Sequence, residues 1–153
     1  MSLPLNMSLP LKGQCNCGEV EFEILGSLPA MYKCYCSLCQ KQSGTASNAA
    51  TIVKPENFSW IRGIDRVTKW KKDSGFNSHF CSTCGSPVPN PIGTDLVWIP
   101  LGLVGALETI KVVNLFENTK PDWESTCVTE NHLLKGIRSA DDLFKVLVDN
   151  SQE

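Results

Sequence analysis

The stretch GQCNCGEVEFEIL, residues 13–25, joins a Cys-x-Cys-Gly turn to a run in which apolar and acidic residues alternate. Val20, Phe22 and Ile24 occupy every second position of that run, which is typical of a β-strand with one buried face. The glycine after the second cysteine permits a sharp reversal that lets backbone amides point at the cysteine sulfurs. The stretch therefore predicts a metal-binding turn that leads directly into a strand.

Similar short runs recur along the chain between Gly, Pro, Asn and Ser residues, and this spacing favours an antiparallel β protein. The expected strands cover residues 19–25, 49–53, 58–61, 66–70, 77–80, 96–101 and 111–116. Helical signals are few. A short helix is expected at residues 37–42, and Ser139 with Asp142 three residues later indicates the capped start of a short C-terminal helix. The expected fold class is therefore mainly β.

Composition bounds the number of domains. With 42% hydrophobic and 20% charged residues, the 153-residue chain can bury a core without disulfide bonds, so its eight cysteines need another explanation. A single domain is expected over residues 7–150. The pentapeptide MSLPL occurs at residues 1–5 and again at 7–11, and we interpret residues 1–6 as a cloning remnant or disordered tail outside that domain.

Charge and hydropathy argue against nucleic-acid and membrane partners. The net charge is -2, and Lys69, Lys71 and Lys72 form the only local group among scattered basic residues, so phosphate-backbone binding has little electrostatic support. No apolar run approaches the roughly 20 residues that span a bilayer, and prolines interrupt the N-terminus where a signal peptide would be apolar. We therefore expect a cytoplasmic protein with reduced thiols. The sequence does not indicate an oligomeric state.

Two cysteine pairs, Cys15-x-Cys17 and Cys81-x-x-Cys84, are each followed by glycine. Two such pairs, brought together from distant strands, supply the four thiolates of a closed tetrahedral zinc site. Four thiolates leave no open position on the metal, so the expected role of this zinc is to stabilise the fold. Disulfide bonds are the alternative, but a Cys-x-Cys pair closes a strained ring and cytoplasmic thiols stay reduced.

A third group contains Cys34, Cys36 and Cys39. Three protein ligands with an exchangeable fourth position distinguish a catalytic zinc from a structural one, so these cysteines are candidate catalytic and metal-binding residues. The open position would take water, or a thiol whose pKa the metal lowers. Two alternatives stay open. Cys127 would complete a second closed site, or the three thiols would be metal-free or redox-active.

The order and the amino-acid sequence of these cysteine motifs resemble those of the glutathione-dependent formaldehyde-activating enzyme family, whose zinc domain is also found in centromere protein V. The similarity covers residues 13–123, most of the chain. It lies in the segments GQCNCGEV (13–20), CYCSLC (34–39), FCSTCGSP (80–87), GALE (105–108), NLF (114–116) and KPDW (120–123).

The resemblance implies several coiled antiparallel sheets organised around one structural zinc, held by Cys15, Cys17, Cys81 and Cys84. It implies a second, labile zinc, held by Cys34, Cys36 and Cys39. It also implies an activity, the joining of glutathione and formaldehyde to give S-hydroxymethylglutathione, formally a carbon–sulfur lyase reaction. A small-molecule thiol and a small aldehyde are the partners that follow from it.

Three positions depart from the family pattern. Tyr35 stands where histidine is frequent, Gln40 where arginine is usual and Asn114 where histidine is common. The cysteines are intact, so the departures concern the surroundings of the second metal and the recognition of a glutathione carboxylate. The guanidinium group of arginine, which binds a carboxylate through two parallel hydrogen bonds, is better suited to that carboxylate than the amide group of glutamine is.

Two other classes of function fit the same residues. A non-catalytic interaction module would contain two closed zinc sites, with four protein ligands at the second. A zinc-responsive or redox-responsive protein would lose metal easily from the second group and form reversible disulfides there.

Overall fold

The computed structural model of the chain describes residues 10–105, 107, 110–126 and 138–149. The chain divides into two compact units, Met1–Pro121 and Asp122–Glu153, and all seven clustered cysteines belong to the first. Residues 1–6, interpreted above as a remnant or tail, lie outside the described residues, as does Cys127. The extent of the expected domain, residues 7–150, stays a prediction.

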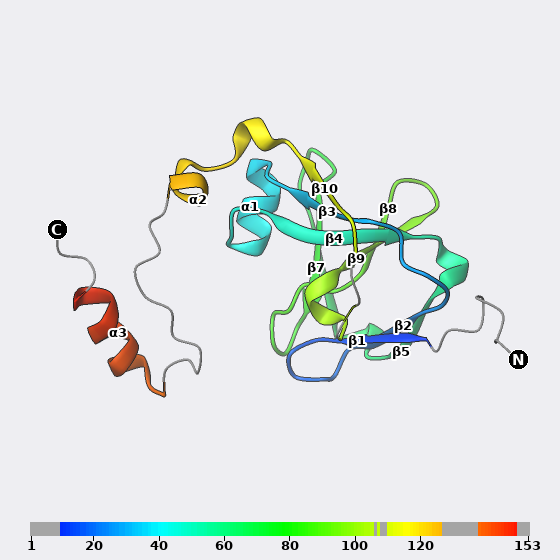
Figure 1. Cartoon of the computed structure of the whole chain (residues 1–153). Coiled ribbons are helices and arrows are strands. Elements are labelled where there is room, and N and C mark those ends of the chain that lie inside the picture. The colour runs from blue at the N-terminus through cyan, green and yellow to red at the C-terminus, as the bar shows by residue number, and fades with distance from the viewer. Residues whose placement is uncertain (1–9, 106, 108–109, 127–137, 150–153) are drawn as a thin grey trace, which may run out of the picture. The chain divides into compact units, whose positions relative to one another are not determined.

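The described part of the first unit consists of three β-sheets (Figure 1). One sheet has the strand order β1 (Leu11–Gln14), β2 (Glu21–Ile24), β5 (Phe58–Arg62). The largest sheet has the order β10 (Val112–Leu115), β3 (Met31–Cys34), β4 (Asn48–Val53), β9 (Leu96–Pro100), β8 (Asn90–Ile92). The third sheet pairs β6 (Val67–Lys71) with β7 (Asn77–Cys81).

The helices are short. In the first unit α1 (Ser37–Ser43) follows β3 and lies beside β4 (Figure 1). Single turns of 3₁₀ helix occur at Pro55–Asn57, Ile64–Arg66, Leu101–Leu103 and Glu117–Thr119. The second unit contains α2 (Asp122–Thr126) and α3 (Ala140–Asp149). The backbone amide of Asp142 donates to Ser139 Oγ at 3.1 Å, so α3 has the cap that its sequence predicts. Among the described helices, none has the length and apolar character that crossing a bilayer requires.

The predicted fold class, mainly β with several sheets and a short C-terminal helix, is confirmed. One pairing differs from the antiparallel expectation, because β10 runs parallel to β3, with Val112 opposite Met31 and Leu115 opposite Cys34. Parallel neighbours need a long connection, and here that connection contains strands β4 to β9. Such a pairing has no local signal in the sequence.

The apolar face of β2 forms the centre of the core. Phe22 and Ile24 are fully buried, as their alternation with glutamates predicts. They pack with Val53 of β4, Ile99 of β9 and, beyond the strands, Leu101. One face of the five-stranded sheet is thereby covered by the three-stranded sheet.

The opposite face of the five-stranded sheet lines a cavity. Ile52 and Trp98 are register partners on β4 and β9, and each directly precedes a core residue. Since successive strand side chains point to opposite faces, these two point away from the core. Both contribute to the wall of the cavity, which also contains three cysteines.

Gly63 fixes a turn close to the first cysteine pair. Its φ is +85°, and a Cβ at this position would overlap the backbone carbonyl of Glu19. Glycine is the residue that meets both conditions, the left-handed conformation and the close backbone approach. The 3₁₀ turn at Ile64–Arg66 therefore lies directly against the chain that leaves the Cys15–Cys17 turn.

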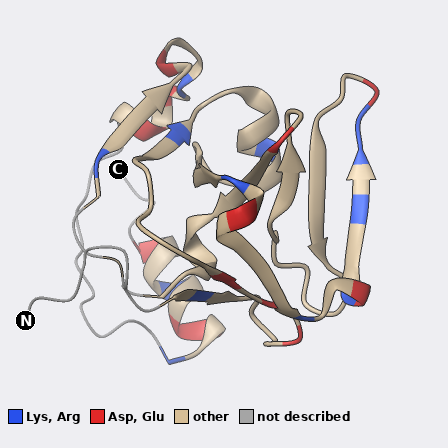
Figure 2. Ribbon diagram, turned by 90° about the vertical axis from the view of Figure 1, so that its right-hand side faces the viewer, with Lys and Arg blue, Asp and Glu red and all other residues tan. Residues whose placement is uncertain are grey.

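Basic and acidic residues are interspersed along the described ribbon (Figure 2). Arg62 of β5, for example, pairs with Glu21 of β2 at 2.9 Å, and Arg66 lies 3.9 Å from Glu19. That nucleic acid is not a partner of this protein stays a prediction from the sequence.

Candidate metal centres

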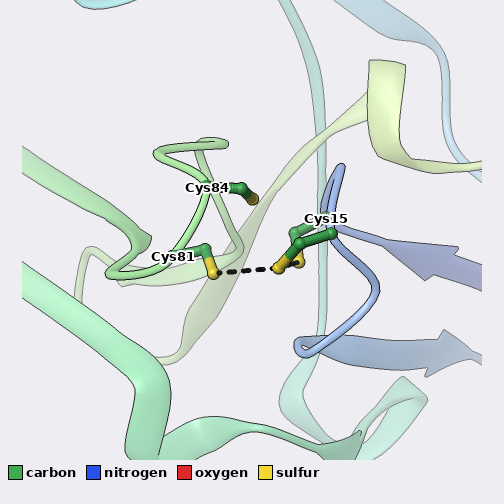
Figure 3. Close-up of side chains that lie close together, drawn as sticks. Cys15, Cys81 and Cys84 are labelled. Carbon is green, nitrogen blue, oxygen red and sulfur yellow. Dashed lines mark hydrogen bonds between the residues drawn. The ribbon is translucent and has the colours of Figure 1, made fainter.

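The four-cysteine cluster consists of Cys15, Cys17, Cys81 and Cys84, whose sulfur atoms all lie within 4.8 Å of one another. Figure 3 shows the side chains of Cys15, Cys81 and Cys84 converging on one space. Cys15 Sγ lies 3.5 Å from Cys17 Sγ, which lies 3.8 Å from Cys81 Sγ. A tetrahedron with Zn–S bonds of ~2.3 Å has sulfurs ~3.8 Å apart, so the donor set fits a single zinc ion.

Local backbone geometry arranges these sulfurs. In the first turn the amide of Gly18 donates to Cys15 O at 3.1 Å, and in the second the amide of Gly85 donates to Cys81 O at 2.8 Å. Both glycines have positive φ, 81° and 78°. A further hydrogen bond joins the two turns, from the Asn16 amide to Ser86 Oγ at 3.0 Å. The two pairs therefore lie in two glycine-terminated turns that a hydrogen bond joins.

Hydrogen bonds at the sulfurs favour thiolates. The amide of Val20 donates to Cys15 Sγ at 3.3 Å in a buried position. Hydrogen bonds with the side chain and backbone of Ser86 lower the pKa of Cys84 to about 5. Cys17 differs: an amide hydrogen bond from Glu19 lowers its pKa, but local desolvation and the neighbouring thiols raise it to about 12 overall. Sulfurs this close repel one another as anions, and a bound cation removes that repulsion.

The three-cysteine cluster consists of Cys34, Cys36 and Cys39, with sulfurs within 4.8 Å of one another. Cys34 ends β3, Cys36 is the N-cap of α1 and Cys39 lies in its first turn. Cys36 Sγ accepts the Cys39 amide at 3.5 Å, so the sulfur itself caps the helix. The cluster therefore assembles at one strand-to-helix junction, from residues close in sequence.

Burial and hydrogen bonding act in opposite directions on these three thiols. Burial raises the pKa of Cys34 and that of Cys39. Burial also raises the pKa of Cys36, but the Cys39 amide and the neighbouring thiols outweigh it and lower the pKa overall. Two of the three sulfurs thus need a cation beside them to become thiolates at neutral pH.

Asn48 bridges two cysteines of this cluster. It opens β4 directly opposite Cys34 and is buried, with 7% of its surface exposed. Its Oδ1 accepts the Cys34 amide at 3.2 Å, and its Nδ2 donates to Cys39 Sγ at 3.1 Å. Sequence reasoning did not identify Asn48, because its only signal is a position just before an apolar run. Hydrogen bonds of this kind orient metal ligands and stabilise their charge.

Replacing Asn48 with leucine is expected to weaken metal binding at the three-cysteine cluster by about 10- to 100-fold, because Cys39 loses a donor and Cys34 an anchor. Competition with a chromophoric chelator measures this affinity. Thr51→Val is the matched control, since Thr51 is a buried polar residue of the same strand that donates to Ala30 O at 3.1 Å, away from the sulfurs. Equal affinities in both variants would contradict the role of Asn48.

A cavity of about 520 Å³ opens beside the three-cysteine cluster. Its wall is the outer face of the five-stranded sheet together with α1 and the turn before β7. Within the described residues this wall contains no Lys, Arg, Asp or Glu. The residues that line it are Tyr32, Cys34, Cys36, Cys39, Gln42, Asn48, Ile52, Gly75, Phe76, Asn77, Asn90, Ile92, Gly93, Trp98 and Leu115.

Two departures from the family pattern have structural roles. Gln40 Nε2 donates to Tyr35 O at 2.7 Å and to Thr119 O at 3.0 Å, so its amide ties α1 to the segment after β10. The Tyr35 ring lies under the ammonium of Lys120, 4.8 Å from its centroid. Neither side chain lines the cavity. Gln40 therefore joins two backbone segments instead of offering a group to a ligand.

Other residues with titratable side chains lie outside the two clusters. His79 belongs to β7 and to neither cluster, and burial together with Lys69 lowers its pKa. Two acidic residues, Asp73 and Glu117, are exposed and do not line the cavity. Cys127 and Glu108 fall outside the described residues, so a fourth ligand from Cys127 stays an open alternative.

The fold and its two clusters define a mainly β protein with two cysteine sites that are able to hold metal ions, one with four sulfurs and one with three. The sequence model of a family described as "Glutathione-dependent formaldehyde-activating enzyme" matches residues 10–122. The chain belongs to this family.

Two individual proteins are similar to the chain, one in sequence and one in fold. A protein of Halomonas elongata named "Putative glutathione-dependent formaldehyde-activating enzyme" is 27% identical over 133 residues, which cover 74% of this chain and 78% of that protein. A crystal structure of a Rhodobacter sphaeroides protein superposes with a TM-score of 0.53 and 19% identity, covering 67% of this chain and 99% of that one. The likeness to that structure concerns the fold alone.

Proposed function

We propose that the chain is a zinc-dependent carbon–sulfur lyase that joins a thiol such as glutathione to formaldehyde or a related small aldehyde. Membership of the family supports the reaction class. The observation that carries the proposal is the position of the three-cysteine cluster, whose sulfurs lie in the wall of a cavity large enough for a small molecule. The four-cysteine cluster supplies a complete tetrahedral donor set of its own, and we assign it a structural zinc.

In this proposal Cys34, Cys36 and Cys39 hold the second zinc. A zinc ion held by these three thiolates would have a fourth ligand position, and it would supply a lowered pKa to a thiol bound there. Asn48 keeps Cys34 and Cys39 in place. The residues of the cavity position the aldehyde carbon near the thiol sulfur, and such positioning is a large source of rate in a reaction between two small molecules.

The proposed reaction forms one bond between the thiol sulfur and the aldehyde carbon while the carbonyl π bond opens. The proton of the thiol ends on the carbonyl oxygen, which becomes a hydroxyl group. No oxidant or reductant is needed. In the reverse direction the same carbon–sulfur bond breaks and the hydroxyl proton returns to sulfur.

The neutral wall of the cavity indicates which part of the substrate enters. A carboxylate inside this wall would lose hydration without finding a cation among the described lining residues. We therefore propose that the aldehyde and the sulfur-bearing end of the thiol occupy the cavity, while charged ends of glutathione stay in solvent. A reducing compartment such as the cytoplasm suits both this thiol and the free cysteines.

Exchange between free and thiol-bound formaldehyde tests the proposal. Magnetisation-transfer NMR with ¹³C-formaldehyde and glutathione measures the rate at equilibrium, with an equal concentration of free zinc as the control for spontaneous addition. The zinc-loaded protein is expected to accelerate exchange and to saturate with glutathione. A rate equal to that of the control would overturn the lyase proposal.

A further inference from the structure

Asn90 lines the cavity and carries a buried hydrogen-bond acceptor without a partner in the described part of the chain. Only 5% of the residue is exposed, and its Oδ1 has no hydrogen-bond partner in the structure. The orientation of the amide is defined, because Nδ2 donates to the backbone carbonyl of Pro91 at 2.9 Å. A buried acceptor left unpaired costs free energy, and a ligand that donates to it recovers that cost.

Tyr32 places a donor in the same wall. Its hydroxyl oxygen accepts the indole N–H of Trp98 at 2.7 Å, which orients the phenol. The hydroxyl proton has no acceptor among the described residues, so it is available to a molecule in the cavity that Tyr32 lines. Tyr32 is partly buried, and a hydroxyl group that accepts a hydrogen bond can also donate one.

Strand register places this donor and this acceptor on the same face of the five-stranded sheet. Asn90 on β8 lies opposite Trp98 on β9, and Trp98 is the residue that binds the Tyr32 hydroxyl. Tyr32 precedes Cys34 by two positions on β3, so both point to the same face of the sheet. Donor, acceptor and the three-cysteine cluster therefore share one wall.

We infer that Tyr32 and Asn90 bind the oxygen atom of the reacting aldehyde, an inference that rests on the proposed function. Tyr32 donates to the carbonyl oxygen as the carbon–sulfur bond forms and negative charge develops there. Once the thiol proton has reached that oxygen, the new hydroxyl group donates to Asn90 Oδ1. A hydroxyl group both accepts and donates, and this pair offers it both partners.

The pair also defines a class of substrate. Aldehydes and the hydroxyalkyl thioethers they form with thiols match one donor and one acceptor on the wall. A thioether without the hydroxyl group would leave Asn90 Oδ1 unpaired, and sites built for a hydroxyl reject ligands that lack it. The structure thus assigns Tyr32 and Asn90 to the selection of hydroxyl-bearing adducts.

Tyr32→Phe and Asn90→Leu test the inference, with Tyr35→Phe as the matched control. Tyr35 lies in the same segment but outside the cavity wall, so its variant removes a hydroxyl group with no proposed role. Each test variant is expected to lower kcat/KM for adduct formation by about tenfold or more, as for one lost hydrogen bond to a reacting oxygen. Absorption of the cobalt-substituted proteins checks that the thiolate ligands are intact.

A binding measurement separates recognition of the oxygen from a structural effect. S-(2-hydroxyethyl)glutathione and S-ethylglutathione differ by one hydroxyl group, and the wild type is expected to prefer the former as a competitive inhibitor by about tenfold. Both test variants are expected to lose this preference, and Tyr35→Phe to keep it. Wild-type rates and preference in the test variants would overturn the inference and leave the lyase proposal standing. A wild type that does not accelerate the reaction would overturn the lyase proposal, and the inference with it.

Discussion

A Cys84→Ser variant is expected to remain unfolded at room temperature. The four-cysteine cluster joins the turn between β1 and β2 to the end of β7, so a metal held there would link two different sheets. Zinc binding at a site of this kind contributes on the order of 10 kcal/mol to folding, and the net stability of a domain is about 5–15 kcal/mol. Loss of one thiolate therefore removes most or all of the net stability. Far-UV circular dichroism and thermal melting measure the outcome.

The matched control for this variant is Ser82→Ala in the same turn. Ser82 is exposed and is not a member of the cluster, so the control is expected to fold and melt as the wild type does. Cys84→Ser protein with wild-type metal content and an unchanged melting temperature would show that the four-cysteine cluster is not a structural metal site.

A Cys36→Ser variant is expected to keep its fold and lose its activity. Cys36 is the N-cap of α1, where its sulfur accepts the amide of Cys39, and serine is among the best residues at such a position. The change in the free energy of unfolding should therefore stay below about 1 kcal/mol. Because the hydroxyl group is a poor zinc ligand, the second metal should be lost and formaldehyde exchange should fall to the spontaneous rate.

Metal analysis, thermal melting and the NMR exchange rate are measured on the same Cys36→Ser sample. An unfolded variant would assign the three-cysteine cluster a structural role equal to that of the first. Full activity with a single metal would place catalysis elsewhere in the protein.

Local patterns in the sequence predicted the elements whose signals are local. The alternation of Val20, Phe22 and Ile24 with glutamates is a period-two pattern, and all three are fully buried. The cap formed by Ser139 and Asp142 needs only three residues of spacing, and it is present. Such features are present in the fold as predicted because they depend on residues that are close in sequence.

The strands that lack a local pattern were not predicted. β1 (Leu11–Gln14) and β3 (Met31–Cys34) are four residues long and contain a lysine each, so neither shows clear alternation. β8 (Asn90–Ile92) contains Pro91, which is tolerated because β8 is an edge strand of its sheet. These strands form because neighbouring strands pair with them, and pairing partners are not visible in sequence.

The residues of the candidate site also divide into those that local sequence predicted and those that it did not. The spacing of Cys34, Cys36 and Cys39 in the sequence was enough to predict that they form one cluster, because a strand-to-helix junction brings residues close in sequence together. Asn48 and Asn90, by contrast, reach the same cavity from β4 and β8, and only the register of the five-stranded sheet places them there. An asparagine in a short strand carries no signal of its own, so residues of this kind become visible only in the folded chain.

Zinc per chain, measured by elemental analysis before and after dialysis against a mild chelator, tests the central claim most directly. Glutathione is then titrated into the fully loaded protein while the remaining metal is followed. The two clusters predict two zinc ions, one retained by four thiolates and one that is labile and responds to glutathione. A single zinc, or two that neither leave nor respond, would contradict an open thiol-binding site and favour a non-catalytic, zinc-stabilised interaction module.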